Sequence, residues 1–267
     1  MTDITDFHRD RRPMPTAWPG RGSLFEVLAG VALANVALTT LLMQLSNSTF
    51  ALPTLGREVL NAEGLVGTTI FSVVGALAMR AGLKNWSIQN WLGIFASSFL
   101  TANGGGTLRD LMNGLAPFWV KSPEFLIIPL LVSVTAFAVR SKRLPIVEPL
   151  LRINDNFATG VFIMVGVMKG AAVMGVDHPM FVFASVFMGV LTGIGGGIVR
   201  DLFLFRRIPT AFVTLGLINA FALSCACALW MKSPPVDLGT WMWLPAGLIM
   251  LAMNSVTSGR TFAYRQT

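Results

Sequence analysis

Apolar residues occur along this chain in long runs that short polar segments separate. The first run spans 24–45, and seven more follow at about 61–79, 87–112, 125–140, 147–171, 179–204, 211–231 and 241–258. Most of these runs have roughly the 20 residues that a helix needs to cross about 30 Å of hydrocarbon. The pattern predicts an all-α integral membrane protein with about eight transmembrane helices.

The first 23 residues are polar and include four arginines and three prolines, so we interpret them as a tail. A basic tail before an apolar run also resembles a secretory signal. The run at 24–45 is long for a signal core, and no small-x-small cleavage site follows it. We therefore predict that it is retained as an extra N-terminal helix.

The basic residues in the two tails and near the ends of the runs are distributed unequally. With eight helices, fourteen of them fall on one side of the membrane and three on the other, namely Arg57, Lys121 and Lys232. Lys and Arg concentrate on the cytoplasmic side of membrane proteins. The distribution predicts that both termini lie in the cytoplasm. We expect a multi-pass protein of the cell inner (plasma) membrane.

A twelve-residue segment recurs in the chain. Residues 100–111 read LTANGGGTLRDL and residues 191–202 read LTGIGGGIVRDL, with eight identical positions at an offset of 91 residues. The offset also relates Phe71 to Phe162 and Gly75 to Gly166. We therefore predict five segments: a polar tail (1–23), the extra helix and its loop (24–60), repeat 1 (61–140), repeat 2 (141–231), and a closing helix with a C-terminal tail (232–267).

Each repeat contains three predicted helices, and an odd number means that the second copy enters the membrane from the opposite face. Inverted repeats of this kind place substrate or ion pathways near the midplane of the membrane, often at interrupted helices. The duplication therefore favours a pore or a transporter, although some duplicated bundles only act as scaffolds.

Each repeat carries three adjacent glycines, Gly104, Gly105 and Gly106 in the first and Gly195, Gly196 and Gly197 in the second. Glycine weakens a helix, and loosened carbonyls at membrane depth are tolerated only against protein or in a water-filled cavity. One interpretation is that the triplets kink their helices beside a polar pathway. The alternative is close helix packing through small residues. The two interpretations are compatible.

Ionisable residues follow both triplets, as Arg109-Asp110 and Arg200-Asp201. Adjacent residues are about 100° apart on a helix, so we expect each arginine to pair with a partner other than its neighbour. Intramembrane charges are candidates for a functional site. The alternative is that they are interfacial anchors or structural ion pairs.

A polar face is predicted on the helix at 147–171. Asp155, Thr159, Gly166 and Lys169 recur at helical spacing, so they share one face that must point toward protein or water. We include Asp155 and Lys169 among the candidate pore or gating charges. The alternative for Lys169 is that its ammonium group reaches the outer interface. Repeat 1 has Gly64 and Ala78 at the equivalent positions, so the repeats differ chemically.

Composition agrees with a membrane protein and excludes several classes of function. The chain is 54% apolar and 12% charged, with a mean hydropathy of +0.66. Its net charge of +7 lies in short clusters between the runs, which does not fit a nucleic-acid surface. The two histidines and two cysteines form no metal-ligand pattern, and there is no catalytic triad or phosphate-binding loop. We therefore predict no enzyme activity, catalytic residue, metal or cofactor.

The motifs resemble those of the bacterial branch of the trimeric intracellular cation (TRIC) channel family, which is also described by a duplicated glycine-transporter-type domain. The segments that carry the resemblance are 101–110, 117–123, 188–201, 207–209, Asp155 and 166–170. The resemblance implies a seven-helix protomer, a homotrimer, and a pore for monovalent cations in each protomer. It also implies that the helices at 87–112 and 179–204 border the pore. Residues 1–60 and the amide of Asn103 depart from the family pattern.

The function expected from this resemblance is a potassium-preferring channel in contact with membrane lipids. The alternative is a secondary transporter of glycine or a similar small zwitterion, in which Arg109 or Arg200 would bind the carboxylate. A membrane scaffold without transport is a third class. Nothing in the sequence separates the channel from the carrier.

Overall fold

The computed structural model describes residues 62–80, 83, 87–138, 144–205, 215–233 and 243–261, which form helices and no strand. These helices are α2 (Ala62–Arg80), α3 (Ile88–Met112), α4 (Phe118–Lys121), α5 (Glu124–Ala138), α6 (Leu144–Met174), α7 (Phe181–Phe203), α9 (Gly216–Lys232) and α10 (Trp243–Thr261). Apart from the short α4, they coincide with seven predicted runs, and the all-α class is confirmed. The predicted helix at 24–45 lies outside the described residues.

Two of the described helices contain stretches long enough to cross a bilayer, and others expose apolar surface. By length and composition alone, two stretches can cross a membrane, Ile153–Met174 in α6 and Phe181–Phe203 in α7. Four further apolar stretches are shorter, Gly67–Arg80, Glu124–Ala138, Gly216–Lys232 and Leu244–Thr257. Large apolar side chains are exposed along α5 and α9, for example Leu131 and Phe221. An extended apolar exterior of this kind is typical of a surface that contacts lipid or another protein.

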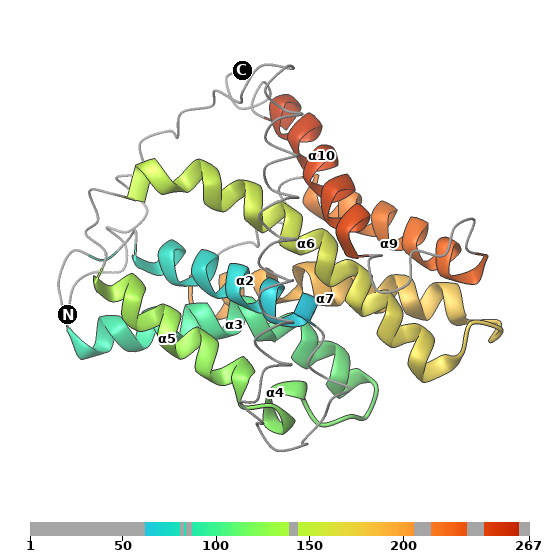
Figure 1. Cartoon of the computed structure of the whole chain (residues 1–267), viewed down its shortest axis with the longest axis horizontal. Helices are drawn as coiled ribbons and strands as arrows, with labels where there is room; N and C mark the ends of the chain where they lie inside the picture. Colours follow the sequence, from blue (N-terminus) through green and yellow to red (C-terminus); the bar gives the residue numbers. More distant parts are fainter. Residues whose placement is uncertain are drawn as a thin grey trace.

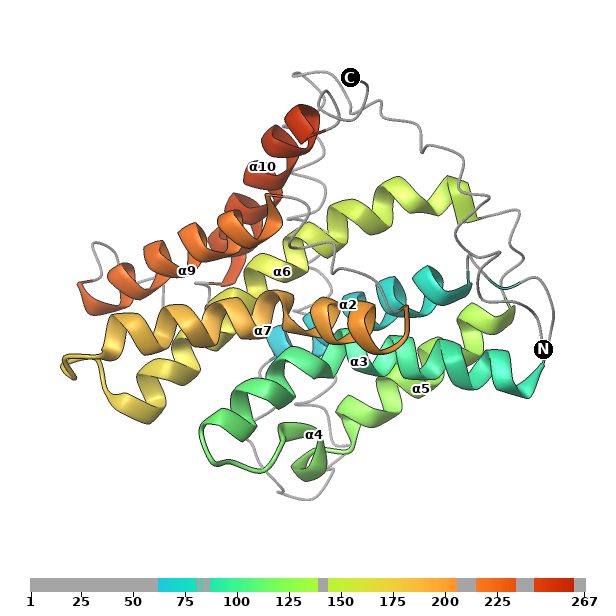
Figure 2. The same cartoon turned by 180° about the vertical axis from the view of Figure 1, so that it is seen from behind.

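The helices form two three-helix units. In the first, α2, α3 and α5 pack on one another, and in the second α6, α7 and α9 do the same. The units meet through α3 against α7 and α2 against α6, while α10 packs on α6 and α9. Figures 1 and 2 show α3 and α5 toward one end of the molecule and α9 and α10 toward the other. This is the arrangement of two repeats and a closing helix that the sequence predicts.

Equivalent glycines make equivalent contacts inside the two units. A Cβ atom on Gly75 of α2 would lie 2.5 Å from the hydroxyl of Thr101 on α3. A Cβ atom on Gly166 of α6 would lie 2.6 Å from the hydroxyl of Thr192 on α7. Both pairs are related by the offset of 91 residues. The two repeats therefore share a packing arrangement as well as a motif.

Residues that the offset relates also touch each other across the boundary between the units. The rings of Phe71 and Phe162 stack with their centroids 4.9 Å apart. Gly105 and Gly196 meet where α3 crosses α7, with 3.1 Å between a Cβ built on Gly105 and the Gly196 nitrogen. A residue meets its own counterpart only near a two-fold axis, so an approximate two-fold axis relates the units here.

The closing helix α10 is held by apolar packing and by a chain of amides. Close to Gly160 on α6, the backbone of α10 approaches at Ala246, so any side chain at 160 would collide with it. Asn254 of α10 donates to Asn156 of α6 at 2.9 Å and accepts from Asn219 of α9 at 2.7 Å. Such bonds between helices satisfy polar groups that lipid cannot satisfy. They join α10 to the second repeat.

Candidate functional site

The glycine triplets lie where α3 and α7 cross. Both helices run through their triplets without interruption. A Cβ at Gly105 would be 2.5 Å from the Leu191 carbonyl oxygen, and a Cβ at Gly196 would meet the Thr101 carbonyl oxygen. The absence of side chains therefore lets the two backbones touch, which is the packing interpretation of these glycines. The kink beside a pathway stays a prediction.

The outer glycines of the triplets have different surroundings. A Cβ at Gly104 would lie 3.2 Å from the Gly196 Cα, and one at Gly195 would lie 3.0 Å from the Gly105 Cα. At Gly106 the ring of Phe118 fills the space, whereas at Gly197 the nearest atom is 4.0 Å away, on the Arg200 guanidinium. Four of the six glycines therefore form the crossing itself, and Gly197 lies beside it.

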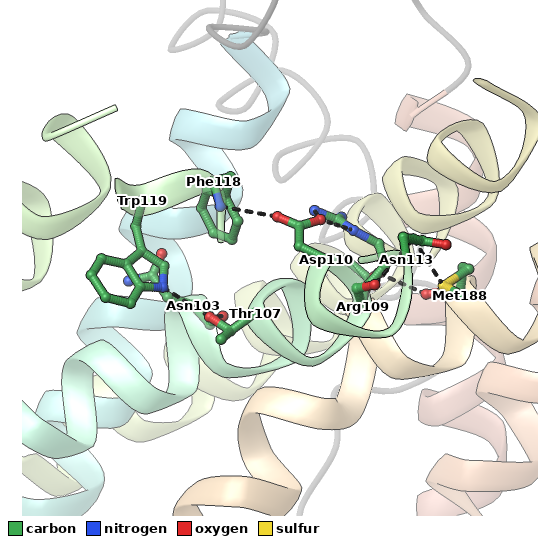
Figure 3. A network of polar contacts seen from close by, with 9 residues as sticks. Asn103, Thr107, Arg109, Asp110, Asn113, Phe118, Trp119 and Met188 are labelled. Atoms are coloured by element: carbon green, nitrogen blue, oxygen red, sulfur yellow. Dashed lines mark hydrogen bonds and ion pairs between the residues drawn. The ribbon is translucent and has the colours of Figure 1, made fainter. Parts of the chain in front are cut away.

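The arginines that follow the triplets pair with their own neighbours, so the prediction of partners elsewhere was wrong. Both Nε and a terminal nitrogen of Arg109 donate to Oδ1 of Asp110, at 2.8 and 2.7 Å. Figure 3 shows the guanidinium folded back beside this carboxylate. The argument from helix angles neglected the length of the arginine side chain, which reaches around the helix. Both side chains are almost fully buried, and burial favours a closely paired, neutral group over two separate charges.

Asp110 also fixes the chain that follows α3. Its second carboxylate oxygen accepts the backbone N–H of Phe118 at 3.0 Å, and the Phe118 ring lies 5.9 Å from the Arg109 guanidinium. Trp119 donates to the Thr107 hydroxyl at 2.9 Å, so both residues tie α4 back to α3 (Figure 3). The acidic partner of the arginine thus positions the connection to α5 as well.

The second repeat contains the equivalent pair. Arg200 donates through Nε and a terminal nitrogen to Oδ1 of Asp201, at 3.1 and 2.9 Å. A ring again faces the guanidinium, here Phe205 at 5.6 Å. The other terminal nitrogen of Arg200 lies 3.5 Å from the Thr101 hydroxyl of the first repeat. The two repeats therefore present the same buried, neutralised pair, at opposite ends of the α3–α7 crossing.

The predicted polar face of α6 points partly at α7. Gly166 and Thr159 are buried, and the Thr159 hydroxyl donates to the Asp155 carbonyl oxygen at 2.8 Å. Asp155 is half-buried, and the charges of Arg200 and Asp201 are close enough to act on it. Lys169 is exposed near the other end of the helix. Asp155 therefore lies within electrostatic reach of the second Arg–Asp pair, whereas Lys169 lies toward the other end of α6.

Sequence reasoning missed the polar residues that join helices. These are Asn156, Asn219, Asn254 and Thr257 in the second repeat and closing helix, and Ser98 in the first repeat, whose hydroxyl donates to the backbone carbonyl of Ser72. An asparagine within an apolar run was the available signal, because its amide must find a partner at membrane depth. Among the residues that the structure describes, no group of three or more His, Cys, Asp or Glu side chains could hold a metal ion.

The fold and the site define an integral membrane protein built from an inverted duplication, with paired charges at a glycine crossing. The family model described as glycine transporter matches this chain twice, at residues 63–141 and 152–232. The chain belongs to this family, and the family resemblance expected from its motifs is confirmed.

Named relatives are bacterial membrane proteins. The UPF0126 inner membrane protein YadS of Escherichia coli strain K12 is 33% identical over 196 residues, which are 70% of this chain and 86% of YadS. A UPF0126 membrane protein of Vibrio cholerae is 32% identical over 216 residues, covering 76% of this chain and 84% of that protein. Both matches cover most of the length of the relative, so the similarity is not limited to one repeat.

Solved structures share the fold. One is a TRIC cation channel whose structure was solved to explain conductance. It has a TM-score of 0.62 at 23% sequence identity, and the match covers 74% of this chain and 93% of the channel chain. The TRIC trimeric intracellular cation channel orthologue from Rhodobacter sphaeroides has a TM-score of 0.54 at 25% identity, covering 73% and 95%. The chain therefore has the fold of these channels.

Proposed function

We propose that this protein is a channel that conducts monovalent cations, with a preference for potassium, through a pore in each protomer of a homotrimer in the cell inner membrane. The observation that carries the proposal is the balance of charge at the second Arg–Asp pair. Asp201 already neutralises Arg200, and Asp155 on α6 adds a carboxylate within electrostatic reach of the pair. When Asp155 is ionised, the three groups together carry one negative charge, which attracts cations and repels anions.

The same balance argues against binding of a substrate carboxylate by the arginines. Arg109 and Arg200 each direct two nitrogens at their own aspartate, and both side chains are buried. A carrier for glycine would need one of them to exchange its aspartate for the substrate. The solved structures of similar fold are described as cation channels, which supports the same conclusion.

The pathway in this proposal runs beside the α3–α7 crossing, because the crossing itself is closed by backbone contact at Gly105 and Gly196. In the channel, the Arg–Asp pairs act as ion-paired supports at its two ends. Asp155 and Lys169 act as the charges of α6 along it, and membrane lipids cover the apolar exterior. The predicted kinks at the triplets belong to this proposal, since they would offer backbone carbonyls to the ion.

Reconstitution tests the function directly. Liposomes that contain the full-length protein should release potassium down its gradient and should not accumulate labelled glycine. Uptake of labelled glycine, driven by a gradient and without potassium flux, would favour the carrier.

Replacing Asp155 by Asn should lower the potassium conductance several-fold and weaken the discrimination between potassium and chloride, because the unbalanced charge is removed. Single-channel recording and reversal potentials in a potassium chloride gradient measure both effects. Lys121→Gln is the matched control, since Lys121 is an exposed charge on the short helix α4. An Asp155→Asn variant with unchanged conductance and selectivity would remove Asp155 from the pathway.

Both termini are expected in the cytoplasm. In a variant in which alanine replaces Cys225 and Cys227, a single cysteine at Thr54 should react with an impermeant maleimide added outside the cell. A cysteine at Ser141 should react only after the membrane is opened. The reverse pattern would contradict the eight-helix topology.

A further inference from the structure

An unusual carbonyl lies inside the first repeat. Pro129 is in the interior of α5 and has no backbone N–H, so the carbonyl of Phe125, four residues earlier, loses its helical partner. The side-chain nitrogen of Asn103 on α3 donates to this carbonyl at 2.9 Å. This bond fixes the orientation of the Asn103 amide, because a flipped amide would place its side-chain oxygen against the Phe125 carbonyl oxygen.

The other end of the same amide has no partner. Asn103 is fully buried, and its side-chain oxygen accepts no hydrogen bond. The same holds for the hydroxyls of Thr68 and Ser72 on α2, which are also fully buried. Three side-chain oxygens without partners therefore lie within one three-helix unit.

These oxygens lie at neighbouring levels of the unit. Ser98 of α3 donates to the Ser72 carbonyl at 3.0 Å and lies 3.4 Å from the Pro129 carbonyl oxygen, so the three helices meet there. The helices α2 and α3 are antiparallel. Thr68 lies one turn before Ser72 on α2, and Asn103 lies just over one turn after Ser98 on α3. Thr68 is therefore near the level of Asn103. These polar side chains of α2 and α3 and the carbonyls of Phe125 and Pro129 on α5 thus lie at adjacent levels of the first unit.

Where the structure describes the second repeat, most of these polar side chains are replaced by apolar ones. Thr68 has a polar equivalent there, Thr159, but its hydroxyl donates to the Asp155 carbonyl oxygen. At the positions of Ser72, Ser98, Asn103 and Pro129 the second repeat has Ile163, Gly189, Ile194 and Ala220. Ile163 and Ala220 belong to an apolar core cluster, and Ile194 packs against that cluster. Two buried hydroxyls in the second repeat also lack partners, those of Ser185 and Ser224, but each lies against a glycine of a neighbouring helix.

Buried oxygens without partners are costly, and native proteins satisfy nearly all such groups with protein or ordered water. A buried water needs two to four polar partners, and the oxygens of Thr68, Ser72 and Asn103 are available as such partners. The named oxygens are neutral hydroxyl, amide and carbonyl groups. Neutral oxygens of this kind replace the hydration shell of monovalent cations, whereas calcium sites use carboxylates.

We propose that the interior of the first repeat is a hydrated site that admits a monovalent cation, with Thr68, Ser72 and Asn103 supplying side-chain oxygens. The inference that a cation enters this site depends on the proposed channel function, whereas the inference that the site is hydrated depends only on the buried oxygens. The second repeat lacks the site, so the two halves of the protein contribute unequally to the passage of ions.

Thallium, which scatters anomalously and substitutes for potassium, is the probe. In crystals of the full-length protein soaked with a thallium salt, an anomalous peak is expected among these three side chains. The peak should disappear in the Thr68→Val variant, which keeps the shape of the side chain and removes its hydroxyl. Absence of the peak in the wild-type protein would overturn the cation site.

Substitution of two buried serines, Ser72 and Ser224, distinguishes a functional site from hydroxyls that are buried without a partner. Ser72→Ala should lower the potassium conductance several-fold and lower the melting temperature, whereas Ser224→Ala should leave conductance unchanged. If Ser72→Ala instead raises the melting temperature and conducts normally, its hydroxyl is simply buried without a partner and the proposal is wrong. If the wild-type protein conducts no cation, the channel function fails, and the thallium map still decides the site.

Discussion

Gly196→Ala should prevent the two repeats from joining, and Gly197→Ala should not. A methyl group at 196 would collide with the Thr101 carbonyl on the opposite helix, where only backbone can move aside. Overpacking a tight contact typically costs about 1–3 kcal/mol and occasionally more, and a backbone collision belongs at the upper end. At 197 the nearest atom is 4.0 Å away and sits at the end of a long side chain.

The comparison is made on the full-length protein in detergent. Gly196→Ala should yield aggregate in size-exclusion chromatography or a melting temperature far below that of the wild-type protein, and Gly197→Ala should elute and melt like the wild type. Equal behaviour of the two variants would mean that the contact at the crossing does not decide folding. Potassium flux through the folded Gly197→Ala protein then tests the predicted kink separately, because this substitution changes the backbone flexibility of α7 and not the helix contact.

Arg200→Met should be the most destabilising change among the charged residues of α7. It removes both donors from Oδ1 of Asp201, which is fully buried. Removing one partner of a buried pair costs about 3–5 kcal/mol, because the remaining charge has lost its compensation. Denaturation followed by tryptophan fluorescence measures the loss.

The double variant Arg200→Met, Asp201→Leu is the control for this prediction. Replacing both members of a buried pair by apolar residues is often close to neutral, so the double variant should recover part of the stability that the single variant loses. If the double variant is no more stable than Arg200→Met, the loss does not come from an uncompensated carboxylate. It would then reflect the packing of the arginine stem.

The helices and their pairing into repeats could be predicted because hydrophobic runs and a constant offset are properties of the sequence itself. The pairing of Arg109 with Asp110 could not, because helical angle alone ignores how far an arginine side chain reaches. The amide chain through Asn156, Asn219 and Asn254 shows another limit. Each asparagine is visible in an apolar run, but its partner depends on how three helices pack.

The partnership of Asn103 with Pro129 lay within reach of sequence reasoning. A proline inside a helix predicts one carbonyl without a partner, four residues earlier. Comparison of the repeats then shows that Asn103 and Pro129 are replaced together, by Ile194 and Ala220. What the sequence could not supply was the distance between the two helices, and hence the bond itself.

The reciprocal contacts at the α3–α7 crossing have the form of an isologous interface, in which one surface binds a copy of itself. Gly105 approaches the carbonyls of Leu191 and Thr192, and Gly196 approaches those of their counterparts, Leu100 and Thr101. A single three-helix unit with this surface could therefore form an antiparallel dimer, with its two copies inserted in opposite directions. Fusion of two such copies into one chain fixes their orientations. It also allows each copy to change independently. Pro129 and Asn103 show this, because they were either gained in the first repeat or lost from the second, which has Ala220 and Ile194.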